Sequence, residues 1–253
     1  MRVVSLLPLS ALLLTLGVSR CVGQFMRHGD AGQMRAAMGV SSADCDDAQT
    51  GLEMDWDGSA DEYTCSAEQS GAASGTGSVL ESKLERMCLE VPADFQPEHI
   101  CMNVSIEYTE TIPTTVNHRP LWAVYGEYTY LPPQRWTHNI EHGAVVMLYH
   151  PCADSSEVDK LKQLVRGCIR KHVITPYNKL PMEQPLALAT WGCHLHMAQV
   201  DEAAVRSFIR ETALQGTEGH LSREGQYDYM LVQKAQPPVG SDIDDSVLCP
   251  NQP

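Results

Sequence analysis

The sequence predicts an α+β fold: a single domain, stapled by disulfides, in which a sheet carries two helices packed on one face. The core of the chain alternates short apolar runs with amphipathic segments in the order strand, helix, strand, strand, helix. That order favours a sheet covered by segregated helices. The chain also has nine cysteines in 253 residues but no C-x-x-C pair, which indicates disulfides rather than a zinc ribbon or a redox motif.

Hydrophobic periodicity places the elements. Apolar residues that alternate with polar ones predict half-buried strands, and continuous apolar runs predict buried strands. Asp154 and Asp201 each precede a segment with apolar residues at helical spacing, so both are expected to begin helices as N-caps. The predicted strands are 104–108, 144–149, 172–177 and 186–191, and the predicted helices are 158–169 and 201–209.

Charge and composition divide the chain further. The formal net charge is −14, and an acidic chain repels phosphate backbones, so a nucleic-acid partner is excluded. Residues 24–80 combine acidic clusters with a small-residue stretch at 70–78, a composition typical of disorder. The predicted organisation is a signal peptide at 1–23, an acidic and largely disordered segment at 24–80, a domain at 81–235 with its core at 105–215, and a tail at 236–253.

The N-terminus is typical of a secretory signal. Arg2 precedes an apolar run over residues 3–18, and cleavage after Ser19 or Gly23 fits the small-x-small rule. The alternative is an uncleaved anchor, but the run is shorter than the ~20 apolar residues that a membrane span needs. No second run of that length follows, so we expect a secreted chain without a membrane span in its mature form.

Export would allow the remaining eight cysteines to pair as four disulfides. Their connectivity is open, since eight cysteines allow 105 pairings, and the expected local pair is Cys88 with Cys101. Asn103 begins the triplet Asn-Val-Ser, which predicts a glycosylation site. The eight cysteines are Cys45, Cys65, Cys88, Cys101, Cys152, Cys168, Cys193 and Cys249.

The candidate functional residues are a group of histidines around residues 138–142. His138, Glu141 and His142 fit the H-x-x-E-H pattern of one class of zinc protease. That chemistry needs both histidines on one helix face, and Gly143 with the preceding Pro132-Pro133 leaves room for barely two helical turns. We therefore expect a loop that enters the strand 144–149, and a protease is disfavoured.

The same residues suggest a metal site without catalysis. A loop folded against the upstream aromatic segment would bring His118, His138 and His142 together, and three imidazoles suit zinc or copper. Glu141 would then hold one imidazole in position without binding the metal itself, or take a proton from bound water. The alternative is a structural loop that satisfies its own hydrogen bonds.

A secondary metal candidate is the pair His194 and His196. Residues two apart on a strand share a face, and the neighbouring Cys193 and Met197 are soft ligands that suit copper. The alternative places Cys193 in a disulfide and Met197 in the core.

The chain resembles the DUF3105 domain family over roughly residues 105–215. The string His-Asn-Ile-Glu-His-Gly-Ala-Val-Val at 138–146 is the most specific part of that resemblance. His118 falls where the family's opening motif ends, although the Ser-Gly that precedes that histidine in bacterial members is missing. The other matching pieces are 112–126, Leu131-Pro132, Tyr149, Pro151, 189–192 and 201–209.

The resemblance implies a family and a region but no reaction. Its animal members are typically membrane proteins, and this chain departs from them by lacking a downstream spanning segment. We therefore expect a secreted, non-catalytic binding protein with an unidentified protein or small ligand as its partner. The alternative is a zinc or copper protein built on His118, His138 and His142, and a metal-dependent hydrolase is less favoured still.

Overall fold

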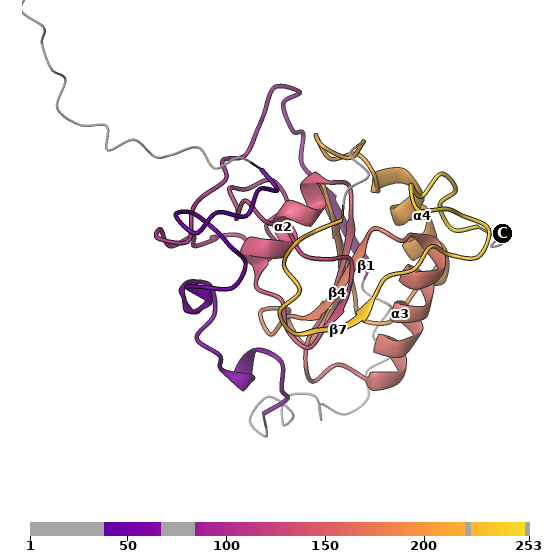
Figure 1. The fold of residues 1–253 in the computed structure, drawn as a ribbon. Helices are drawn as coiled ribbons and strands as arrows, with labels where there is room; N and C mark the ends of the chain where they lie inside the picture. Colours follow the sequence, from indigo (N-terminus) through magenta and orange to yellow (C-terminus); the bar gives the residue numbers. More distant parts are fainter. Residues whose placement is uncertain (1–37, 67–83, 221–223, 251–253) are drawn as a thin grey trace, which may run out of the picture. The chain divides into compact units, whose positions relative to one another are not determined.

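The computed structural model describes residues 38–66, 84–220 and 224–250. The predicted signal peptide, with Cys21, and the small-residue stretch at 70–78 lie outside these residues. In the described part of the chain, the sequence folds around one sheet, and the sequence prediction of an α+β architecture is confirmed (Figure 1).

Within the described residues the sheet has seven strands, in the order β1-β6-β5-β3-β4-β2-β7. It is mixed: β4 runs parallel to β3 and to β2, and the other neighbours are antiparallel. The strands are β1 (Leu84–Cys88), β2 (Gly126–Tyr128), β3 (Val145–Tyr149), β4 (His172–Pro176), β5 (Leu186–Thr190), β6 (Cys193–Met197) and β7 (Leu231–Lys234).

Strand β3 lies at the centre because its sequence is apolar on both sides. Successive side chains point to opposite faces of a sheet. Val145 and Met147 therefore join the core beneath one pair of helices, and Val146 and Leu148 join the core on the other face. A strand buried on both faces explains the continuous apolar run.

Helices α3 (Ser155–Cys168) and α4 (Glu202–Thr212) cover one face together, as the sequence predicted (Figure 1). The Asp154 side chain accepts hydrogen bonds from the backbone N–H groups of Ser156 and Glu157, and Asp201 caps α4 through Ala204. These aspartates satisfy N–H groups that the first helical turn leaves unpaired.

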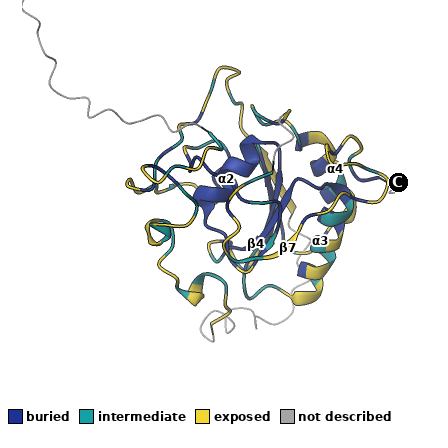
Figure 2. Cartoon of the chain, in the orientation of Figure 1, coloured by how far each residue is buried: buried dark blue, intermediate teal, exposed yellow. Residues whose placement is uncertain are grey.

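Helix α2 (Pro133–Glu141) covers the opposite face, where the sequence analysis expected a loop. All nine of its residues are buried, and Figure 2 shows the helix in the buried colour along its whole length. Pro133 is tolerated because it occupies the first turn. Gly143, with a φ of 82°, ends the helix, and two backbone bonds close it: Gly143 N–H to Ile140 and Ala144 N–H to Asn139.

Two other expectations about strands need correction. Residues 104–108 form no strand, because their carbonyl groups accept hydrogen bonds from side chains instead of from a neighbouring strand. Arg119 donates to the Val104 carbonyl and Gln134 to that of Ile106. Strands β2 and β6 were not among the predicted strands, and neither were the two edge strands, β1 and β7. The edge strands are largely exposed, so neither carries the apolar signal of a core strand.

Among the described cysteines, four disulfides connect distant parts of the chain: Cys45–Cys101, Cys65–Cys152, Cys88–Cys193 and Cys168–Cys249. The expected pairing of Cys88 with Cys101 is therefore wrong. Cys88 ends β1 directly opposite Cys193 on β6, which is a neighbour that only the sheet register supplies. Cys249 attaches the end of the predicted tail to α3, where Asp245 also accepts from the N–H groups of Arg170 and Lys171.

Candidate metal centre

Helix α2 and the segments packed on it bring four histidines together. His138 and His142 lie one helical turn apart on α2. His118 lies beside His138, with ring centroids 4.4 Å apart. His99 joins them because its segment pairs with that of His118, through backbone bonds from Ile100 N–H to the His118 carbonyl and from His118 N–H to Glu98.

The inner cluster consists of His99, His118, His138 and Glu141. One donor atom from each residue lies within 4.8 Å of every other. The Glu141 Oε2 atom is 3.1 Å from His118 Nε2 and 3.7 Å from His99 Nε2. His118 and His138 are completely buried, and Glu141 is 3% exposed.

Backbone carbonyls fix the tautomers of two of these rings. His118 Nδ1 lies 2.9 Å from the Val116 carbonyl oxygen, and His138 Nδ1 lies 2.6 Å from that of Arg119. A carbonyl oxygen only accepts, so each Nδ1 must carry the proton. The Nε2 atom of each neutral ring therefore presents a lone pair to the inside of the cluster.

His118 Nε2 and Glu141 Oε2 therefore face each other as two acceptors. Within the described residues, His99 Nε2, His118 Nε2 and Glu141 Oε2 are buried and have no hydrogen-bond partner. Buried polar atoms are almost always partnered, and two acceptors only 3.1 Å apart need a proton or a cation between them. This arrangement suits a bound cation.

Burial also sets the charge states that metal binding needs. Desolvation lowers the pKa of His118, holds that of His138 well below its ordinary value, and lowers that of His142 to about 3. Burial alone would raise the pKa of Glu141, but positive charge at His118 and His99 and the hydrogen bond from Thr217 lower it overall. Imidazole must be neutral and carboxylate ionised to bind a metal. Burial favours the neutral imidazoles, and positive charge inside the cluster favours the ionised carboxylate.

A second group shares His138. His142 Nε2 is 3.2 Å from His138 Nε2 and 3.3 Å from Glu218 Oε2, and these three residues also meet the spacing for a metal. Trp122 packs on the His142 ring, with centroids 4.0 Å apart. One Nε2 atom binds one ion, so the two groups compete for His138.

The loop after α4 positions both carboxylates. Thr217 donates its hydroxyl to Glu141 Oε1 at 2.8 Å, which leaves Oε2 for the cluster, and the Glu218 N–H donates to the Glu141 carbonyl. The loop approaches so closely that a Cβ atom on Gly216 would lie 2.1 Å from that carbonyl oxygen. A glycine is therefore required at this contact.

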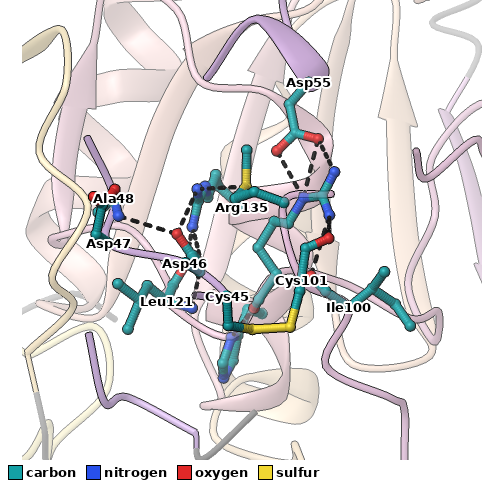
Figure 3. Close-up of polar contacts among 12 residues, drawn as sticks. Cys45, Asp46, Asp47, Ala48, Asp55, Ile100, Cys101, Leu121 and Arg135 are labelled. Atoms are coloured by element: carbon teal, nitrogen blue, oxygen red, sulfur yellow. Dashed lines mark hydrogen bonds and ion pairs between the residues drawn. A yellow bond between two sulfur atoms is a disulfide. The ribbon is translucent and has the colours of Figure 1, made fainter. Parts of the chain in front are cut away.

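Two buried arginines flank the cluster, and the acidic N-terminal segment neutralises them. Arg119 follows His118 directly and forms an ion pair with Asp55 at 2.5 Å. Arg135, one turn before His138, pairs with Asp46 at 2.6 Å. Figure 3 shows Asp46 against Arg135, with the Cys45–Cys101 disulfide beside them.

These ion pairs correct the expectation of disorder for part of residues 24–80. Residues 38–66 have a defined conformation, held by Cys45, Cys65 and two buried carboxylates. Isolated acids suggest a solvated segment when only the sequence is known, because their partners lie about 60 to 90 positions away.

The secondary candidate pair lies elsewhere, on β6. His194 and His196 share a face, with ring centroids 5.0 Å apart. Neither of the two soft ligands considered with them joins the pair. Cys193 is bonded to Cys88, and Met197 is completely buried in the core under α3 and α4.

Sequence reasoning missed His99 and Glu218. Neither lies in a motif, and each reaches the cluster only through the fold: His99 through the pairing with His118, and Glu218 through the loop that contacts Glu141. The predicted glycosylation site, Asn103, has an exposed side chain, and its modification stays a prediction.

Comparison with known proteins places all of these residues in one family region. Residues 99–225 match the family described as "Protein of unknown function (DUF3105)". The chain belongs to the DUF3105 family. The matched region begins at His99 and extends past Glu218, so it contains every residue of both groups.

A curated relative of this DUF3105 protein is tumor protein p53-inducible protein 13 of Rattus norvegicus, which is 32% identical over 66 residues. The match covers 26% of this chain and 17% of the relative, so the chain spans about a sixth of the relative's length. No solved structure matches the chain. In the described part of the chain, no helix has the length and apolar character to cross a membrane.

Proposed function

We propose that this DUF3105 protein is an exported metal-binding protein that holds one zinc ion between His99, His118, His138 and Glu141. The observation that carries the proposal is the convergence of ring nitrogens and a carboxylate oxygen from these residues, of which His99 Nε2, His118 Nε2 and Glu141 Oε2 are buried and have no hydrogen-bond partner among the described residues. A divalent cation would satisfy all of them at once.

The donor set and its spacing favour zinc. Zinc prefers four nitrogen, sulfur or oxygen donors at about 2.0–2.2 Å in a tetrahedron, whose corners then lie about 3.3 Å apart. The Glu141 oxygen lies 3.1 and 3.7 Å from two of the imidazole nitrogens, which brackets this value. Copper is the other metal that imidazoles accept readily, and metal analysis distinguishes the two.

Four protein donors favour binding over catalysis. Catalytic zinc sites keep an open position for water or substrate, whereas closed sites stabilise a fold. Here the fourth position belongs to Glu141, and His118 and His138 are completely buried. The H-x-x-E-H residues do share helix α2, but Glu141 faces His118 and His99 rather than open solvent.

Export is part of the same proposal. Four disulfides persist in oxidising compartments rather than in the cytosol, and all eight cysteines of the described residues are paired. The signal-like N-terminus supports this route. Sequencing the N-terminus of secreted protein tests it, with a start after Ser19 or Gly23 expected.

Metal analysis and thermal unfolding test the centre. The secreted chain, purified without a histidine tag, should contain about one zinc per chain. Zinc should also raise the melting temperature of the chelator-treated protein, because an ion at a hundredfold excess over Kd contributes about 2.7 kcal/mol of stability. His118→Gln should abolish the rise.

The matched control is His220→Gln, which changes an exposed histidine outside both groups and should leave the rise intact. A wild-type melting curve that neither zinc nor copper moves would reject the metal centre. The cluster would then be a structural element of a protein whose partner binds elsewhere.

A further inference from the structure

The structure also places a thioether, two imidazoles and a carboxylate around a cavity on the first edge of the sheet. The register between β1 and β6 sets Met87 opposite His194 and Glu85 opposite His196. Directly opposed residues on antiparallel strands have Cβ atoms about 5 Å apart. All four side chains therefore share one face of the sheet, next to the Cys88–Cys193 pair in the strand register.

The neighbouring strand leaves room for the two rings. Residues Ala187 and Ala189 of β5 lie opposite His196 and His194, and their methyl groups are too small to fill the space above the sheet. The loop at 110–116 closes over this space and leaves a cavity of about 370 Å³ that Met87, Glu85 and both histidines line.

One ring already lacks a partner. The His196 Nδ1 atom is buried and has no hydrogen-bond partner among the described residues. The His194 ring stands almost perpendicular to it, at 88°, with centroids 5.0 Å apart. Lone pairs from two such rings can be directed at one point in the cavity, and an unpartnered buried nitrogen is costly unless something binds it.

We infer that this cavity binds a Cu(I) ion through His194, His196 and the Met87 thioether, with Glu85 balancing its charge. Soft thioether ligands select Cu(I), and harder divalent ions favour more nitrogen and oxygen donors. Among the described residues that line the cavity there is no thiolate, and the nearby Cys88 and Cys193 are bonded to each other. Met87 is 46% exposed, so the cavity is open to solvent at that residue.

This site is separate from the proposed zinc centre. Val116 lies between them: it lines the cavity on one side, and its carbonyl oxygen orients His118 on the other. The two sites also differ in donor type, because the buried centre offers a carboxylate and no sulfur. Soft and borderline ions should therefore distribute between them, and the inference does not depend on the proposed function.

The test is a competition for Cu(I) between the full chain and a chromophoric Cu(I) chelator under anaerobic conditions. The chain carries Cys21→Ser, so that no free thiol contributes if residue 21 is retained. We expect one tightly held Cu(I), at least a tenfold weaker affinity in Met87→Leu, and complete loss in the double variant His194→Gln, His196→Gln. Met54→Leu, a change at a methionine of similar exposure, is the matched control and should bind like wild type.

Two further measurements establish whether copper occupies this cavity or the buried centre. X-ray absorption of the copper-loaded chain should show one sulfur neighbour that disappears in Met87→Leu, and the zinc content of that variant should be unchanged. Wild-type affinity in both Met87→Leu and the double histidine variant would overturn the inference. Loss of Cu(I) in His118→Gln but not in the double variant would overturn it too, since copper would then occupy the buried centre.

Discussion

Arg135 and Asp46, 89 positions apart in the chain, form a two-point ion pair in the interior of the protein. Arg135 Nη1 donates to Asp46 Oδ2 at 2.6 Å, and Nη2 donates to Oδ1 at 3.0 Å. Arg135 lies one turn before His138 on α2. The acidic N-terminal segment therefore supplies the counter-charge that allows a cationic side chain to be buried beside a cluster that could hold a cation.

We expect Asp46→Asn to lower the free energy of unfolding by about 3–5 kcal/mol, because the change leaves the buried guanidinium without a counter-charge. Urea denaturation with and without zinc measures the loss. Asp47→Asn is the matched control: the Asp47 carboxylate accepts hydrogen bonds from the nearby Gln49 and Thr50 and is less buried than that of Asp46, so its loss should cost far less. Equal losses in the two variants would show that the Arg135 pair contributes little.

Gly143 should tolerate no side chain. Its φ of 82° already disfavours an L-residue, and a Cβ atom would lie 2.7 Å from the Leu214 Cα atom. We expect Gly143→Ala to destabilise the protein beyond the roughly 1–2 kcal/mol that a left-handed conformation costs an alanine, and to weaken zinc binding by shifting His142 and the end of α2.

Gly58→Ala separates the two causes of that loss. Gly58 has a similar φ of 86°, but no atom of the described residues would lie within 4 Å of a Cβ atom added there. Chemical denaturation of both variants should show only the conformational cost at Gly58. If both variants lose the same free energy of unfolding, the close approach of Leu214 does not contribute to the loss at Gly143.

The Cys45–Cys101 disulfide should support the metal centre as well as the fold. It closes a loop over a separation of 56 residues, for which the chain-entropy argument gives about 4 kcal/mol. Cys101 lies two residues after His99, so the Cys45→Ser, Cys101→Ser variant should also bind zinc more weakly.

The Cys168–Cys249 disulfide provides the comparison. Its separation is 81 residues, so the same argument gives a similar contribution of about 4 to 5 kcal/mol. The bond is at the end of α3, in the core on the face of the sheet opposite α2. Isothermal titration with zinc, below the unfolding temperature of each variant, should therefore show weakened binding only when Cys45 and Cys101 are changed.

Local patterns in the sequence were sufficient for the core of the fold. The apolar run of β3 and the N-caps Asp154 and Asp201 carry their signals within a few residues. Helix α2 was not predicted, because Gly143 follows Pro132-Pro133 so closely that the segment between them was judged too short for a stable helix. In the structure that same glycine closes the helix, and tertiary packing stabilises nine residues that would be marginal alone.

The site was predicted only in part for a different reason. His138, Glu141 and His142 share one motif, and their proximity follows from helical spacing. His99 and Glu218 reach the cluster through backbone pairing and a loop contact with no local pattern. The ion pairs of Asp46 and Asp55 have the same character, because a buried acid and an exposed one look alike in a sequence.

His172 should make the protein sensitive to acid independently of any metal. The side chain is buried, its Nδ1 atom donates to the Ile169 carbonyl at 2.7 Å, and burial lowers its pKa to about 4. In the unfolded chain the pKa returns to about 6.5. Between these values the unfolded state binds a proton that the folded state does not, so stability falls as pH falls.

The contribution of His172 to stability is complete above about pH 6.5. It is lost as the pH falls to about 4, below which the side chain is protonated in both the folded and the unfolded state. Over this window the loss should approach about 1.4 kcal/mol per pH unit, or about 3 kcal/mol in all. His172→Gln keeps a donor for the Ile169 carbonyl but cannot titrate. Urea denaturation between about pH 4.5 and 6.5, with a chelator present, should therefore give a shallower pH dependence for the variant than for wild type, since all other groups cancel in the comparison. Parallel pH dependences would mean that His172 titrates alike in the folded and unfolded states.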